Sequence, residues 1–306
     1  MHLLAQDLVN GILAGGILAV VALGFSLVWG IMNIINLAHG AFVMLGAYTT
    51  YQLFATFHVD PFLSLPISFV LLFALGYLIQ RLLLNWIARA PLLTTFLFTF
   101  GLSLLVVNIA LIVWTGDTRG VTTSYSGANF TLGDVTVPWA KLYTLLAALA
   151  ITGTMQLWLV RSKTGRAIRA TSMDIGAAQL SGVRVTEIYA IVFGLGAGLA
   201  GVAGTLISLS YSLHPTMGDL FLIKAFVVCV LGGLGSVQGA LLGGLVYGIV
   251  EAFATQLDFT IGSNCGPLGA GCQHISGSGL QDAIALIVLL IVLIVRPRGI
   301  MGKATA

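Results

Sequence analysis

Residues 33–48 read NIINLAHGAFVMLGAY, and the fold must account for the polar side chains inside this apolar stretch. Asn33, Asn36 and His39 recur every three residues, so on a helix they would form a narrow spiral of side chains, with Gly40 allowing a close neighbour or a bend. Such groups need hydrogen-bond partners in lipid and are expected to face protein. We expect them to brace a helix junction or to line a polar path, with bracing favoured over direct solute contact.

The rest of the chain is too apolar for a water-soluble protein. Of its 306 residues, 58% are hydrophobic and 8% are charged, and the mean hydropathy is +1.05, whereas soluble domains carry about 25% charged residues. A spanning helix needs about 20 mostly apolar residues. We therefore expect an all-α polytopic membrane protein, with residues 1–306 as one transmembrane domain of about eight helices. The expected spans lie near residues 8–30, 33–56, 62–84, 92–115, 142–160, 188–209, 221–231, 237–255 and 280–295.

The segment 221–255 is expected to be a broken or re-entrant helical hairpin. Its glycine-rich part, VLGGLGSVQGALLGG (230–244), interrupts an apolar run. Non-helical backbone at membrane depth is tolerated only inside protein or beside a wet cavity, so a hairpin near a translocation path and a plain cytoplasmic turn both stay open. Lys224 either snorkels to the outer surface or takes part in the path. The candidate path residues in this segment are Lys224, Gly232, Gly233, Gly235 and Ser236.

The basic residues predict the orientation in the membrane. Ten of the 13 Lys and Arg residues fall in three segments, and short basic loops stay in the cytoplasm. The loop at 161–187 is then cytoplasmic, and the loops at 116–141 and 256–279 are extracytoplasmic, as is the N-terminus. Because the basic residues form no single stripe, no nucleic-acid partner is expected. The three basic segments are Arg81 and Arg89; Arg161, Lys163, Arg166, Arg169 and Arg184; and Arg296, Arg298 and Lys303.

Two features are expected in the outer loops. NFTLGDVTV (129–137) predicts either a short β-hairpin or a flexible loop. Cys265 and Cys272 flank GPLGAG, and they could form a disulfide if their loop faces an oxidising compartment, or remain two free thiols. A metal site would need more ligands than His274 offers, so no metal is expected.

The segment RSKTGRAIRATSMDIGAAQLSGVRV (161–185) is the most informative polar stretch. Thr171 followed three residues later by Asp174 resembles a capping box, a short alanine-rich helix follows, and Gly182 would end it. A capped helix on a basic loop suits docking to a partner. The alternative is a helix lying on lipid, but its exposed face is expected to lack the large apolar residues that would anchor it.

Four separated stretches give a resemblance that runs in order over nearly the whole chain. These are GFSLVWGIMNIINLAHGAFVMLGAY (24–48), ATSMDIGAAQLSGV (170–183), FGLGAGLAGVAGTL (193–206) and VLGGLGSVQGALLGGLVYGIVEA (230–252). They look like the permease subunits of branched-chain amino acid ABC importers. The resemblance implies a bacterial inner-membrane subunit that pairs with a second, similar permease, two cytoplasmic ATPase subunits and a periplasmic substrate-binding protein.

The resemblance also implies a coupling helix that docks on the ATPase. ABC permeases carry a Glu-Ala-Ala-x-x-x-Gly pattern there, which is matched by Ala177, Ala178 and Gly182, whereas Gly176 stands where the glutamate would be. This chain has no phosphate-binding loop, because its Gly302-Lys303 pair is followed by alanine. We therefore expect no catalytic residue and no cofactor on this chain, with ATP and Mg bound by the partner ATPase subunits.

Three other functions are weighed against this one. A permease of the same family for urea or short amides would have a similar sequence. An ion-coupled secondary transporter would need intramembrane carboxylates at a broken helix, whereas Glu251 and Asp282 are expected near span ends. An intramembrane enzyme using His39 has no supporting spacing of nucleophile and base.

Overall fold

The computed structural model describes residues 2–87, 91–123, 125, 127–132, 135–256, 259–261, 273–275, 277–297 and 299–302. In chain order its elements are α1 (His2–Met32), α2 (His39–Phe57), α3 (Pro61–Ile79), the π-helical turn η1 (Gln80–Leu84), α4 (Asn85–Ile87), α5 (Leu92–Trp114), β1 (Asn129–Leu132), β2 (Val135–Pro138), α6 (Trp139–Arg161), α7 (Lys163–Met173), α8 (Ile175–Leu180), α9 (Val185–Ser208), α10 (Met217–Gly232), α11 (Val237–Ala254), β3 (Phe259–Ile261), β4 (Gln273–Ile275) and α12 (Gly277–Val295).

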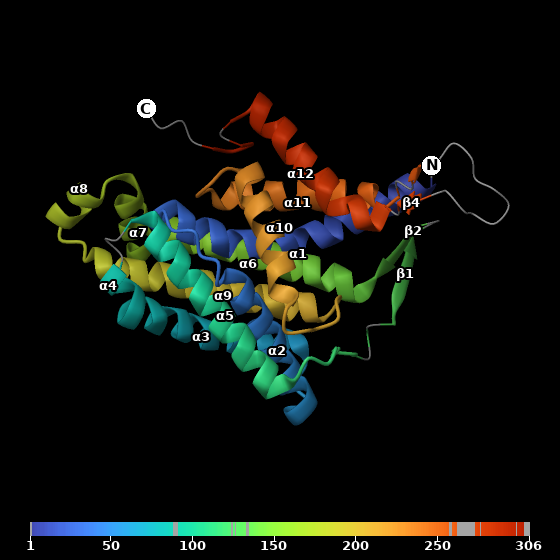
Figure 1. Cartoon of the computed structure of the whole chain (residues 1–306), viewed down its shortest axis with the longest axis horizontal. Helices are drawn as coiled ribbons and strands as arrows, with labels where there is room; N and C mark the ends of the chain where they lie inside the picture. Colours follow the sequence, from blue (N-terminus) through green and yellow to red (C-terminus); the bar gives the residue numbers. More distant parts are fainter. Residues whose placement is uncertain are drawn as a thin grey trace.

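The expected all-α polytopic architecture is confirmed by a body of long apolar helices (Figure 1). The helices α2, α10 and α12 occupy the remaining predicted spans, and the number of about eight crossings and the re-entrant hairpin stay predictions. Within the described part of the chain, six helices are long and apolar enough to cross a membrane: Leu4–Met32, Pro61–Ile87, Leu92–Trp114, Trp139–Arg161, Val185–Ser208 and Val237–Ala254.

The centre of the body is formed by α1 and α9. Their most apolar windows are 89% and 94% buried, against 22% for the corresponding windows of α3 and α5, so the latter two lie at the periphery. Glycines let the backbones approach closely. A Cβ added at Gly15 of α1 would lie 2.6 Å from the carbonyl oxygen of Gly244 in α11, and one added at Gly194 of α9 would lie 3.0 Å from the carbonyl oxygen of Phe73 in α3.

The helices α1, α2 and α3 repeat the packing pattern of the helices α9, α10 and α11. Helix α1 packs along α11 as α9 packs along α3, and α10 packs on α1 as α2 packs on α9. The helices α1 and α9 also contact each other but run in opposite directions along the body (Figure 1). The two sets of three helices therefore form an inverted pair, which meets where α2 contacts α10.

The two ends of the body differ in composition. The helices α4, α7 and α8 gather at one end, while the start of α1 and the strands β1, β2 and β4 lie at the other (Figure 1). Arg81, Arg161 and Arg184 therefore lie at one end, as the charge pattern requires. The strands β1 and β2 pair antiparallel with Phe130 opposite Val137, so the hairpin prediction is confirmed over the flexible loop. Arg89, Cys265, Cys272, Arg298 and Lys303 lie outside the described residues.

Candidate functional site

The opening polar stretch is not the helical spiral expected from its three-residue spacing, and this prediction is wrong. Helix α1 ends at Met32, residues 33–38 are not helical, and α2 begins at His39. Asn33 adopts the left-handed conformation with φ of 52°, which ends α1 and turns the chain, and its side chain is exposed. A run of residues 34–38 then leads back into the body.

The contacts of His39 show how far the chain returns into the body along α1. Its Nε2 lies 2.9 Å from the carbonyl oxygen of Val21, and its ring packs edge-on against Phe25 with the centroids 5.7 Å apart. Val21 lies 11 residues before the end of α1 at Met32 (32 − 21), which is about 16 Å along a helix axis. Helix α2 thus begins deep inside the body, where His39 is fully buried and its Nδ1 has no hydrogen-bond partner among the described residues.

Two side chains hold the non-helical segment in place. Asn36 is 2% exposed, and its Oδ1 accepts a hydrogen bond of 3.1 Å from the backbone N–H of Ala38. The hydroxyl of Thr99 in α5 accepts from the N–H of Leu37 at 3.3 Å and donates to the carbonyl of Ile35 at 3.1 Å. These bonds satisfy polar backbone groups that would otherwise be unpaired at membrane depth. Thr99 is a residue that the sequence analysis missed, because nothing local links it to residues 35–37.

Gly40 brings the two broken regions together. A Cβ added there would lie 2.2 Å from the carbonyl oxygen of Gly218, and one added at Gly218 would lie 2.4 Å from the carbonyl oxygen of Gly40. The first turns of α2 and α10 are therefore in direct backbone contact. Helix α10 follows a second non-helical stretch, residues 209–216, so both helices begin inside the body after an interruption.

The glycine-rich segment forms a tight turn between α10 and α11. Gly233 and Gly235 have positive φ values of 106° and 78°, which glycine adopts without strain. Ser236 caps α11 by accepting from the N–H of Gly239 at 3.0 Å, and the N–H of Gly235 donates to the hydroxyl of Ser26 at 3.1 Å. An added Cβ at Gly30, three residues from the start of the interruption at 33, would lie 2.4 Å from the Cα of Gly235. This turn therefore lies against the C-terminal part of α1, at Ser26 and Gly30.

Lys224 is paired rather than free. Its Nζ donates to Glu251 of α11, both side chains being 14% exposed, and Asp282 of α12 lies 3.6 Å away with its side chain 49% exposed. The hydroxyl of Tyr247 also donates to Asp282 at 3.4 Å. A charge pair of this kind removes the cost of an isolated buried lysine. The sequence indicated each charge separately but not that three helices bring them together.

Residues 161–187, which the sequence predicts to couple to an ATPase and which we call the coupling segment, contain two short helices, α7 and α8. Asp174 caps α8, since its Oδ1 accepts from the N–H of Ala177 at 3.0 Å. Thr171 is not the capping residue that the sequence predicted, because it lies inside α7, is buried, and donates its hydroxyl to the carbonyl of Ala167 at 2.9 Å. Gly182 has a φ of 82°, as expected for a residue that ends a helix.

The exposed side of the coupling segment is more apolar than predicted. Leu180 is 93% exposed, Met173 87% and Ile175 43%, whereas the sequence analysis expected no large apolar residues there. That expectation is wrong because Ile175 and Leu180, at the two ends of α8, and Met173 before it are all exposed around the alanines. Ala178 is buried, and Ala177 is exposed next to these residues.

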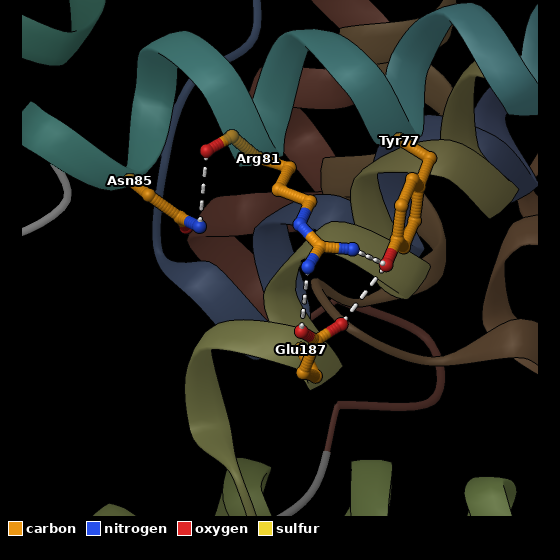
Figure 2. Close-up of polar contacts among 4 residues, drawn as sticks. All are labelled: Tyr77, Arg81, Asn85 and Glu187. Carbon is orange, nitrogen blue, oxygen red and sulfur yellow. Dashed lines mark hydrogen bonds and ion pairs between the residues drawn. The ribbon is translucent and has the colours of Figure 1, made fainter.

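A polar cluster connects the start of α9 to the end of α3, close to the coupling segment. Figure 2 shows Glu187 of α9 accepting from the Tyr77 hydroxyl at 2.9 Å, while one guanidinium nitrogen of Arg81 donates to that hydroxyl at 3.0 Å. The other nitrogen lies 3.7 Å from Glu187. Arg81 belongs to the π-helical turn η1, an irregularity that is frequent at functional positions. Asn85 donates to the carbonyl of Arg81 at 3.5 Å.

The opposite end of the body carries a second polar cluster. The backbone groups of Arg119 and Leu213 exchange hydrogen bonds of 2.9 and 2.7 Å, which joins the segment after α5 to the stretch before α10. Arg119 also donates to the Tyr51 hydroxyl at 3.0 Å. Burial, together with the nearby Asp60 carboxylate, raises the pKa of Tyr125 to about 12.

Among the residues that the structure describes, no three His, Cys, Asp or Glu side chains gather to hold a metal ion.

These features define a polytopic α-helical membrane protein with helices interrupted inside the body, an arrangement typical of transport proteins. The chain belongs to the family described as permease component of branched-chain amino acid transport systems, which matches residues 8–295. No solved structure matches the chain.

Curated relatives of similar length belong to the same group. The high-affinity branched-chain amino acid transport system permease protein BraD of Pseudomonas aeruginosa is 31% identical over 97% of this chain and 95% of its own length. The corresponding protein LivH of Escherichia coli strain K12 is 29% identical over the same shares. A probable branched-chain amino acid transport permease protein LivH of Methanocaldococcus jannaschii is 29% identical over 96% of this chain and 91% of its own length.

Proposed function

We propose that this chain is the transmembrane permease subunit of an ATP-binding-cassette importer for branched-chain or other neutral amino acids. It forms the translocation path with a second, homologous permease in a bacterial inner membrane. A periplasmic binding protein delivers the solute, and two cytoplasmic ATPase subunits bind ATP and Mg. The observation that carries this proposal is the family match over residues 8–295, which covers every membrane helix.

The coupling segment offers a route by which ATPase movement reaches the membrane helices. The exposed apolar side chains Met173, Ile175 and Leu180 suit a cleft in a partner protein. Helix α8 leads through Gly182 into α9, and α9 is linked to α3 through Glu187 and Arg81. A shift of α8 would therefore displace two helices of the body together, and the starts of α2 and α10 would move with them.

Transport measurements on the assembled complex test this proposal. The tagged chain is purified from native membranes, its partners are identified by mass spectrometry, and the complex is reconstituted to follow uptake of labelled leucine, with urea as the competing candidate solute. We expect a second permease, two ATPase subunits, and uptake that needs ATP. A chain recovered alone, with uptake that persists without ATP and stops when the ion gradient collapses, would overturn the proposal in favour of a secondary transporter.

A matched pair of variants tests the docking role of α8. Leu180→Asp places a charge on the 93% exposed apolar position, whereas Met301→Asp places the same charge on a 39% exposed position beyond α12, outside the coupling segment. We expect Leu180→Asp to lose most of the ATPase subunits from the purified complex and Met301→Asp to keep them. Equal retention by both variants would show that α8 is not the docking element.

A further inference from the structure

Five aromatic rings follow one another at the end of the body that carries the β1–β2 hairpin. In order they belong to Phe130 of β1, Trp139 and Tyr143 of α6, Phe62 of α3, and Tyr125 between α5 and β1. Neighbouring ring centroids lie 5.6 to 6.2 Å apart. Tyr and Trp gather at the headgroup level of a bilayer, because their rings are apolar and carry one polar group. This row of rings therefore lies at headgroup level, on the side that the basic residues predict to be outside.

Three rings of this row line a hollow formed by α3, α6 and the segment after α5. The hollow has a volume of about 370 Å³ and is lined by Phe62, Tyr125 and Tyr143. The Phe62 ring lies at 36° to the Tyr125 ring and at 85° to the Tyr143 ring, so the rings form separate walls rather than one stack. The faces of aromatic rings attract cations. We name this hollow the aromatic pocket.

A carboxylate lies beside the aromatic pocket. The Tyr125 hydroxyl is placed to donate to either oxygen of Asp60, at 3.3 and 3.1 Å, and the N–H of Phe62 donates to one of them at 2.8 Å. Asp60 is exposed, and within the described part of the chain no Lys, Arg or His side chain forms an ion pair with it. The described residues thus hold a negative charge next to the rings and supply no cation for it.

Pro66 adds an acceptor to the aromatic pocket and a second hollow below it. Proline has no N–H, so the carbonyl oxygen of Phe62, four residues earlier in α3, lacks its usual helical partner. A hollow of about 450 Å³ is lined by Pro66, Ile67, Val70 and Leu71, and we name it the α3 groove. Phe62, Pro66 and Val70 follow at four-residue steps and so share one face of α3. The α3 groove therefore continues the aromatic pocket from headgroup level toward the centre of the membrane.

We propose that the aromatic pocket and the α3 groove bind one phospholipid with a primary ammonium headgroup, such as phosphatidylethanolamine. The ammonium lies against the rings of Phe62, Tyr125 and Tyr143, and its three N–H groups donate to the Asp60 carboxylate and the Phe62 carbonyl oxygen. One acyl chain lies along the α3 groove. This inference needs only the membrane position of α3 and α6, and it does not depend on which solute the chain transports.

The charge and the shape of the site select this lipid over other candidates. An anionic headgroup without an ammonium would bring a phosphate toward the Asp60 carboxylate, and such a pairing of like charges is unfavourable. A free amino acid carries the same ammonium group, but it would leave the apolar α3 groove unfilled. A phospholipid with an ammonium satisfies both parts of the site.

Native mass spectrometry measures the headgroup preference. The full-length chain, with the subunits that purify with it, is supplied with equal amounts of phosphatidylethanolamine and phosphatidylglycerol. We expect the parent protein to retain phosphatidylethanolamine over phosphatidylglycerol by about threefold or more. Equal retention of the two lipids would overturn the proposal.

Two carboxamide variants test the role of the charge. Asp60→Asn keeps an oxygen that caps α3 and accepts from Tyr125, but it removes the negative charge. Asp117→Asn removes the charge of another exposed carboxylate, which does not line the aromatic pocket. We expect the lipid preference to fall by about threefold in Asp60→Asn and to stay unchanged in Asp117→Asn. The same preference in both variants would contradict a site at Asp60.

Two leucine variants test the role of the rings. Tyr143→Leu removes one wall of the aromatic pocket at a position that is 43% exposed, and Phe100→Leu removes a ring that is 47% exposed on α5. We expect only Tyr143→Leu to lower the preference for phosphatidylethanolamine. An equal effect of the two substitutions would show that the ring at position 143 has no specific part in binding.

Photo-labelling tests the site in the unmodified protein and so does not depend on the folding of any variant. A phosphatidylethanolamine with a diazirine in one acyl chain is irradiated with the full-length chain, and the adducts are mapped by peptide mass spectrometry. We expect adducts at residues 66–71 in excess over Ile287 and Ile291, which are each 55% exposed on α12, and we expect unlabelled phosphatidylethanolamine but not leucine to displace them. Equal labelling of α3 and α12 would indicate only general lipid contact. Displacement by leucine would assign the pocket to an amino-acid ammonium, and either result would overturn the proposal.

Discussion

The contact between Gly40 and Gly218 predicts a measurable loss of stability from a single methyl group. In Gly40→Ala the new Cβ would lie 2.2 Å from the carbonyl oxygen of Gly218, whereas such contacts are essentially never shorter than 3.0 Å. Helices α2 and α10 must therefore separate by at least 0.8 Å (3.0 − 2.2). Because the opposing atom belongs to the backbone, no rotamer change relieves the overlap. Overpacking of this kind lowers the free energy of unfolding by about 1–3 kcal/mol.

Gly153→Ala is the matched control for this measurement. Gly153 lies in α6, and an added Cβ would meet no atom within 4 Å, so the control keeps the helix propensity gain of about 1 kcal/mol without an overlap. Thermal unfolding of the purified protein is followed by a thiol-reactive dye that detects buried Cys229, with Cys265 and Cys272 replaced by serine. We expect a lower midpoint for Gly40→Ala than for the parent protein. A midpoint equal to that of Gly153→Ala would refute the close contact.

Three further predictions follow from polar contacts. Lys224→Met alone strands a partly buried carboxylate and should lower the free energy of unfolding by about 3 kcal/mol, while Lys224→Met with Glu251→Gln should recover most of this loss in the same thermal assay. Glu187→Gln removes an ion pair whose side chains are 55% and 40% exposed, so it should cost under about 1 kcal/mol, and the difference from the parent protein should vanish in high salt. Tyr125 should ionise near pH 12, and because its pKa is raised on folding, its stabilising contribution is present below pH 10 and lost as the pH rises through 12. The ionisation of Tyr125 is measured as the difference between the absorbance titrations of the parent protein and of Tyr125→Phe. A midpoint near pH 10 in that difference would contradict the prediction.

Much of the helical body could be predicted from the sequence because hydropathy acts locally. A run of about 20 apolar residues can satisfy its backbone in lipid only as a helix, so long segments such as Leu92–Trp114 and Val185–Ser208 were located within a few residues. The C-terminal end of α8 was likewise readable, since Gly182 has a clear preference for positive φ, whereas the N-terminal cap was assigned to Thr171 and is in fact Asp174.

The interruption at residues 33–38 could not be predicted, because its causes are distant in the sequence. The spacing of Asn33, Asn36 and His39 fits a helix as well as it fits a loop with two buried side chains. The loop is favoured over a helix by two contacts. The Thr99 hydroxyl bonds to the backbone of Ile35 and Leu37, and the Val21 carbonyl oxygen lies 2.9 Å from His39 Nε2. The pairing of Lys224 with Glu251 also depends on packing between helices rather than on any motif.

The inverted pair formed by α1–α3 and α9–α11 has a consequence for how the chain is inserted into the membrane. In the first set the basic residue, Arg81, follows the last helix, whereas in the second set Arg184 precedes the first helix. Each half therefore carries the charge that directs its own orientation, at opposite ends of otherwise similar units. The inserting machinery can thus orient each unit from its own flanking arginine as it emerges.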